Sequence, residues 1–101
     1  MAGTISLSPE KRWSVAGWLF DWTVEFLAGR VAEPEVRASL QEIVDESLGW
    51  LGLGDFGAAA EREMRVLLRH EVVDAADAAF GADMAGREAV LGHLRELAAA
   101  V

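Results

Sequence analysis

The segment from Ser8 to Arg30 constrains the fold more than any other, because it holds three of the four tryptophans and two of the four phenylalanines. Ser8 is a suitable N-cap, since its hydroxyl can accept a hydrogen bond from a free amide of the first turn. Pro9 would follow at the first helical position, where its missing N–H costs nothing. No other proline occurs before Pro34. The segment therefore predicts one long helix over residues 9–30.

Placed at about 100° per residue, this predicted helix carries apolar side chains on most of its faces. They form two stripes, one of Trp13, Ala16, Gly17, Phe20, Val24 and Leu27 and one of Val15, Leu19, Trp22 and Phe26. A helix that is apolar nearly all round is usually buried, so we expect it to pack against several neighbours. Trp18 lies on neither stripe and falls on the polar side, beside Asp21 and Glu25.

Apolar residues recur with helical spacing in three further segments, which predict helices over residues 34–51, 56–80 and 84–100. Short connections make consecutive helices antiparallel neighbours. Residues 1–7 alternate too briefly for a strand and are expected to form an extended arm that lays Ile5 or Leu7 on the helices. The sequence therefore predicts an all-α fold, in which residues 1–101 form a single-domain up-down four-helix bundle with a short N-terminal arm.

The chain is acidic, with a formal net charge of -8 and a pI near 4.6. This charge argues against direct binding to nucleic acid or to an anionic membrane, and it favours a basic protein partner or a second copy of the chain. No cysteine is present, which excludes disulfides and zinc–thiolate sites. Lys11 is the only lysine among nine basic residues, a bias typical of bacterial proteins from GC-rich genomes. We expect a cytoplasmic bacterial protein.

Neither a membrane span nor a signal peptide is expected. The most apolar run, residues 13–28, contains Asp21 and Glu25, whereas a spanning helix needs ~20 nearly uncharged residues. No cleavage site of small residues follows the basic pair at Lys11 and Arg12, so a signal peptide is disfavoured.

The sequence lacks the motifs that would indicate an enzyme. It contains no P-loop, no G-x-G-x-x-G, no G-x-S-x-G and no H-E-x-x-H. His70 and Asp74 are four residues apart, yet neither histidine follows a glutamate in the Glu-x-x-His spacing of di-iron bundles. We therefore expect neither an enzyme nor a cofactor, and no metal site.

Glu71 falls among apolar residues of the predicted third helix. A buried carboxylate must be paired or protonated. This position therefore predicts a structural ion pair with an arginine or simple exposure at the edge of the core, and an acid–base or ligand-holding group is the functional alternative. Arg12, Arg30 and Arg87 are the candidates, and the pair Glu71–Arg87 is the one that we expect.

Three hypotheses for function remain open. The first is a small helical protein-interaction module, an adaptor or accessory subunit or a homodimer, that uses the first helix. Its interface would consist of Trp18 and Trp22 with Asp21 and Glu25. The second is an inhibitor or immunity-type protein that blocks a basic partner, such as a nuclease, with an acidic face of Glu42, Asp45 and Glu46. The third is a bundle that binds a metal or a small molecule, with Trp18, Trp22 and Phe26 lining an apolar pocket.

Overall fold

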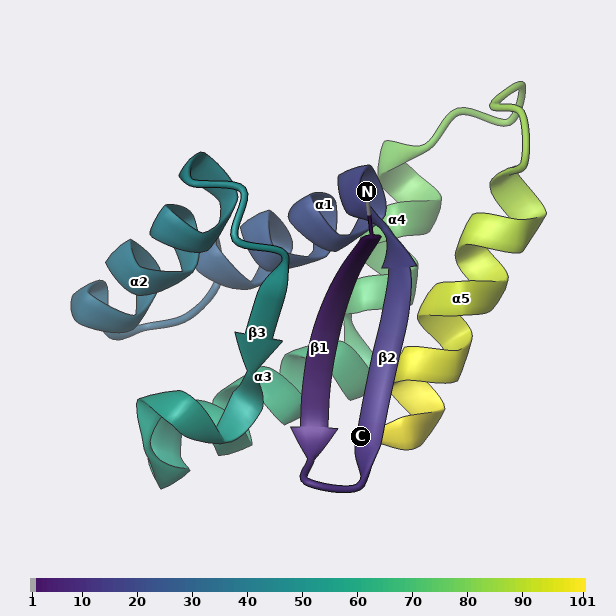
Figure 1. The fold of residues 1–101 in the computed structure, drawn as a ribbon. Helices are drawn as coiled ribbons and strands as arrows, with labels where there is room; N and C mark the ends of the chain where they lie inside the picture. Colours follow the sequence, from purple (N-terminus) through teal and green to yellow (C-terminus); the bar gives the residue numbers. More distant parts are fainter. Residues whose placement is uncertain (1) are drawn as a thin grey trace.

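The computed structural model describes residues 2–101 and contains a three-stranded sheet with helices packed against one of its faces (Figure 1). In chain order the elements are β1 (Ala2–Ser8), β2 (Lys11–Ala16), α1 (Gly17–Ala28), α2 (Pro34–Asp45), β3 (Trp50–Gly52), the short 3-10 helix η1 (Leu53–Phe56), α3 (Ala58–His70), α4 (Val72–Ala79) and α5 (Arg87–Ala100). The predicted all-α four-helix bundle is therefore wrong, because the chain forms a mixed α/β fold.

The residues expected to form an N-terminal arm instead form β1, the central strand of the sheet, whose order is β2-β1-β3. Met1 of that predicted arm lies outside the described residues. Strand β1 pairs antiparallel with β2, so that Ile5 lies opposite Trp13 and Thr4 lies opposite Ser14. The Thr4 and Ser14 hydroxyls hydrogen-bond across the pair at 2.9 Å. These cross-strand contacts are the unit of sheet stability, and they fix the register of the hairpin.

The predicted helix over residues 9–30 is correct only for Gly17–Ala28, which form α1. Pro9 and Glu10 form the hairpin turn, and residues 11–16 form β2. Residues 11–16 alternate exposed and buried, with Trp13 and Val15 facing the core. Those two residues fit an apolar helical stripe and one face of a strand equally well. Pairing with β1 favours the strand over the helix, since strand preference depends on tertiary context.

Strand β3 pairs parallel with β1, and the chain reaches it by a crossover through α1 and α2. The predicted helix over residues 34–51 ends early, at Asp45. Ser47 and Gly49 then adopt positive φ values of 50° and 68°, which reverse the chain before β3 begins. Glycine adopts this conformation without steric cost. The backbone N–H of Thr4 donates to the Gly49 carbonyl at 2.9 Å, where β3 joins β1.

The segment predicted as one helix over residues 56–80 consists of two helices. Residue Glu71 separates α3 from α4 with φ −123° and ψ −26°, outside the helical range. The break turns α4 toward α5 (Figure 1). Helix α5 lies inside the predicted range of 84–100.

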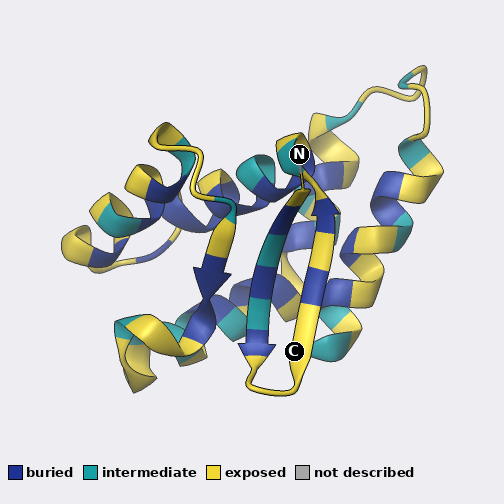
Figure 2. Ribbon diagram, viewed as in Figure 1, coloured by how far each residue is buried: buried dark blue, intermediate teal, exposed yellow. Residues whose placement is uncertain are grey.

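The core lies between the sheet and the helices. The sheet contributes one buried face, formed by Gly3, Ile5, Leu7, Trp13, Val15 and Leu51. Figure 2 shows the alternation along β1 and β2 and the largely exposed opposite face. Helices α1 and α3 pass behind the strands in this view (Figure 1). Phe20 of α1 and Met64 of α3 are fully buried, and the Trp13 indole N–H donates to the His93 carbonyl of α5 at 2.9 Å.

Candidate functional site

An aromatic cluster joins α1 to the end of α4. Trp18 meets Phe80 edge to face, with ring centroids 5.9 Å apart and an interplanar angle of 75°. Trp22 lies one turn further along α1 and contacts Phe80 at 5.1 Å and Phe26 at 5.9 Å. Edge-to-face and offset-stacked rings attract one another beyond their burial of surface. We call Trp18, Trp22 and Phe80 the aromatic surface.

Helix α4 ends at Ala79 and is followed by Phe80, whose ψ of 123° is extended. Two hydrogen bonds from Arg87 fix the backbone here. The guanidinium donates to the Phe80 carbonyl and to the Asp77 carbonyl, each at 3.2 Å, and it also pairs with the Asp77 carboxylate. Arg87 therefore positions the ring that supports the two tryptophans.

Trp18 is 49% exposed even though it rests on Phe80. Trp22 and Asp21 are half-buried, and Glu25 is exposed. The four residues predicted as an interface thus lie on one side of α1, and Phe80 extends that surface to α4. Neither Asp21 nor Glu25 forms an ion pair within residues 2–101. No basic group of residues 2–101 therefore occupies these two carboxylates, which can meet the basic groups of a partner.

Two hollows adjoin the aromatic surface. One, of about 450 Å³, is lined by Ala2, Ala16, Gly17, Trp18, Phe20, Asp21, Ser47 and Gly49. The other, of about 280 Å³, is lined by Trp22, Glu25, Phe26, Arg30, Ala75 and Ala79. Each hollow combines apolar side chains with one of these two carboxylates. An apolar side chain of a partner fits such a hollow, and the carboxylate suits a neighbouring lysine or arginine.

The predicted buried pair between Glu71 and Arg87 is not what the structure shows. The Glu71 side chain is 53% exposed and lies 3.8 Å from Arg30. Arg30 also lies over the Phe26 ring, 4.2 Å from its centroid. The helix break at Glu71 turns this residue out of the apolar face on which an unbroken helix would have placed it.

The acidic residues of α2 form a separate exposed face. Glu42, Asp45 and Glu46 are all exposed at the end of this helix. The Gln41 side-chain amide donates to the Asp45 carboxylate at 3.0 Å. They lie at the C-terminal end of α2, whereas the aromatic surface lies on α1 and at the end of α4.

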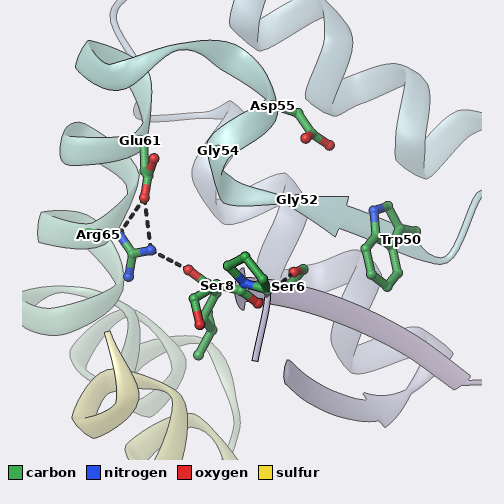
Figure 3. A pocket seen from close by; sticks show the side chains of 10 residues that line it. Ser6, Ser8, Trp50, Gly52, Gly54, Asp55, Glu61 and Arg65 are labelled. Atoms are coloured by element: carbon green, nitrogen blue, oxygen red, sulfur yellow. Dashed lines mark hydrogen bonds and ion pairs between the residues drawn. The ribbon is translucent and has the colours of Figure 1, made fainter. Parts of the chain in front are cut away.

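A third concave region lies where β1 and β3 end (Figure 3). This cleft of about 390 Å³ is lined by Ser6, Leu7, Ser8, Pro9, Trp50, Gly52, Gly54, Asp55, Glu61 and Arg65. The Arg65 guanidinium pairs with Glu61 at 2.8 Å and donates to the Leu7 carbonyl. Arg65 thus links α3 to β1. Trp50 is 43% exposed, and the Arg12 guanidinium lies 5.4 Å from its ring centroid.

The half-buried Phe80 and the exposed Trp50 are residues of these surfaces that the sequence did not predict. Both residues fall at the ends of predicted helices, Trp50 in the helix over residues 34–51 and Phe80 in the helix over residues 56–80. Only the isolated position of each aromatic residue next to glycines, at Gly49 and Gly81, hinted at a chain reversal.

Within residues 2–101, no group of three or more histidine, aspartate or glutamate side chains is arranged to hold a metal ion. No helix in the same range has the length and apolar character needed to cross a membrane. Comparison with known protein families, with curated proteins and with solved structures found no match for this chain.

Proposed function

We propose that this chain is a protein-interaction module without enzymatic activity, an adaptor or accessory subunit that binds its partner through the aromatic surface. The observation that carries the proposal is Trp18, which is 49% exposed yet held in place by Phe80. Tryptophan is enriched among the residues that dominate binding energy at protein interfaces. A ring already fixed by packing also loses little conformational freedom on binding.

The charge around the aromatic surface indicates the chemistry of the partner. Asp21 and Glu25 rim this surface, and the whole chain carries a net charge of -8. A partner with an apolar anchor surrounded by lysine or arginine matches both features. The absence of cysteine suits a reducing, cytoplasmic setting for this proposed module.

A second candidate function is inhibition of a basic protein through Glu42, Asp45 and Glu46. The exposure of all three residues at one end of α2 supports it. Binding of this kind depends strongly on salt, because the Debye length falls to ~3 Å at 1 M. Binding through the aromatic surface keeps most of its strength at high salt, so the two candidates separate in a salt titration.

Affinity capture with three forms of the immobilised protein tests the proposal. Wild type, Trp18→Ala and Trp50→Ala are each exposed to lysate of the source cells. Trp50 is a matched control, since it is a second tryptophan of similar exposure, 43%, outside the aromatic surface. We expect a species that wild type and Trp50→Ala retain and that Trp18→Ala loses.

The captured protein is then purified and its affinity measured for each form. Trp18→Ala should weaken binding by about 2 kcal/mol or more, a factor of roughly 30 in Kd. Circular dichroism confirms that the variant remains folded. Equal losses for the two tryptophan variants, or no loss for either, would refute a partner site on the aromatic surface.

A further inference from the structure

The cleft where β1 and β3 end lies on the exposed face of the sheet, and the strand register places three of its neighbouring residues in a row. Ser6 pairs with Arg12 of β2 on one side and with Gly52 of β3 on the other. Adjacent strands lie about 4.8 Å apart, so this row spans roughly 10 Å. Trp13 and Leu51 face the core, so their neighbours in the row face the exposed side.

Trp50 precedes Gly52 by two residues and lies on the same face of β3, where it is 43% exposed. The Arg12 guanidinium lies 5.4 Å from the centre of its ring, although β1 separates the two strands. The indole therefore reaches across the central strand. A cation over an aromatic ring is attracted to it, so this contact holds the indole in one orientation while much of it stays exposed.

Asp55 fills the place that a side chain at position 52 would take. A Cβ atom at Gly52 would lie 2.5 Å from the Asp55 Oδ2 atom and 2.9 Å from its Cγ atom. The carboxylate therefore lies over β3 on the same face as Trp50, and Figure 3 shows both residues on one side of the cleft. Asp55 is exposed and forms no ion pair within residues 2–101, so no basic group there occupies its carboxylate.

Glu61 and Arg65 of α3 form the opposite side of the cleft, with Ser6 and Ser8 in between (Figure 3). Arg65 donates through Nε to Glu61 and through Nη2 to the Leu7 carbonyl. Its Nη1 atom has no partner within residues 2–101. Because a guanidinium carries five N–H donors, Arg65 retains donors for a ligand.

The charges around the cleft balance. Asp55 and Glu61 carry two negative charges, and Arg12 and Arg65 carry two positive ones. A phosphate would approach both carboxylates, and an ammonium group would approach both guanidinium groups, so each would meet repulsion as well as attraction. The arrangement therefore favours a neutral ligand with many hydrogen-bonding groups.

We infer that this cleft binds a neutral saccharide, with one face of the sugar ring on Trp50. The C–H groups of that face pack against the negative face of the indole. Each sugar hydroxyl both donates and accepts hydrogen bonds, so it can pair with the acceptor Asp55, with the donor Arg65 or with the Ser8 hydroxyl. The volume of about 390 Å³ lies within the range of roughly 300–1,000 Å³ that is typical of small-molecule sites.

This inference goes beyond the proposed function, because the cleft lies at β3 and α3, whereas the aromatic surface lies on α1 and at the end of α4. Its test is an NMR titration of the isotope-labelled protein with glucose, galactose, mannose and N-acetylglucosamine. We expect at least one of these sugars to shift the amide signals of Ser6, Gly52 and Gly54 and the indole signal of Trp50. For ligands of this size we expect a Kd of about 1–10 mM. The position of the shifted signals locates the site in the wild-type protein, without any variant.

Two pairs of variants then identify the groups that bind. Trp50→Ala removes the ring and Asp55→Ala removes the carboxylate, and each should raise the Kd about tenfold or more. Trp18→Ala and Asp21→Ala are the matched controls, because they remove the same two groups at the aromatic surface. We expect both controls to leave sugar binding unchanged. Circular dichroism of every variant establishes that a loss of binding does not reflect unfolding.

Three further ligands test the chemical class. Protonated glucosamine and glucose 6-phosphate keep the sugar ring and add a charge of either sign, and adenosine offers a neutral planar ring instead. We expect each to bind more weakly than the best neutral sugar, because the charged groups meet repulsion and the base carries fewer hydroxyls.

Three results would overturn the inference. One is the absence of any shift with all four sugars at concentrations well above the expected Kd. Another is tighter binding of a charged sugar or of adenosine than of every neutral sugar. The last is an equal loss of sugar binding in Trp50→Ala and Trp18→Ala. Conversely, failure of Trp18→Ala to affect partner capture would refute the proposed function and leave the saccharide site untouched.

Discussion

Trp18 and Phe80 meet edge to face at 5.9 Å, although one opens the first helix and the other follows the fourth. This contact makes the exposed surface of α1 depend on where α4 ends. Trp22 shares the same support, since it lies 5.1 Å from Phe80. The aromatic surface is therefore a tertiary structure and not a property of α1 alone.

The first prediction concerns Phe80→Ala. This change removes the ring on which Trp18 and Trp22 rest, so both tryptophans gain freedom and solvent exposure. Because Phe80 is half-buried, we expect a loss of about 1–3 kcal/mol, below the cost of deleting a fully buried phenylalanine. Urea denaturation measures the loss, and a red shift of tryptophan fluorescence reports the exposure. An unchanged emission spectrum would contradict the contact.

The second prediction concerns Glu71→Ala. The Glu71 and Arg30 side chains are 53% and 42% exposed and lie 3.8 Å apart. Exposed ion pairs contribute little because water and salt screen them. We therefore expect a change below about 0.5 kcal/mol in the free energy of unfolding. A loss of several kcal/mol would show instead that this carboxylate is buried and paired.

The third prediction concerns Arg87→Met, which keeps the length of the side chain and removes the guanidinium. The Arg87 side chain is only 20% exposed, and its hydrogen bonds hold the end of α4. Loss of these charged donors should cost about 1–3 kcal/mol, well above the cost of Glu71→Ala. It should also raise hydrogen exchange near Phe80. Equal stability of the two variants would argue against a tethering role for Arg87.

Local sequence signals located some helices well. Pro34 marks the first residue of α2, and the apolar spacing of Val90, Leu91 and Leu94 places α5 inside its predicted range. Proline at a helix start and apolar spacing act within a few residues, so a short segment of sequence is enough to recognise them.

The sheet could not be predicted from local sequence in the same way. Trp13 and Val15 fit both the helical and the strand period. The place of β1 in the core depends on its pairing with the distant strand β3 as well as with β2, and on its packing against α1. Similarly, the polar-side position of Trp18 was read from the helical spacing, whereas its support by Phe80 required knowing where α4 ends. Glu71 was misplaced because a single interruption in a helix rotates every later residue.

The last prediction compares two glycines, Gly3 and Gly92. A Cβ atom at Gly3 would lie 2.2 Å from the Cγ and 2.3 Å from the Cβ of Phe20, which is fully buried. Phe20 cannot yield, because its own Cβ is part of the clash, so β1 or α1 must shift. Overpacking of this kind costs about 1–3 kcal/mol, and occasionally more.

Gly92 lies inside α5, and a Cβ atom there meets nothing within 4 Å. Because glycine loses more conformational freedom than alanine in a helix, Gly92→Ala should stabilise the protein by about 0.5–1 kcal/mol. Urea denaturation should therefore show a lower free energy of unfolding for Gly3→Ala and a higher one for Gly92→Ala. Combining Gly3→Ala with Phe20→Leu should not restore stability, since leucine keeps the clashing Cβ atom. A neutral effect of Gly3→Ala would contradict the close contact between β1 and α1 at Phe20.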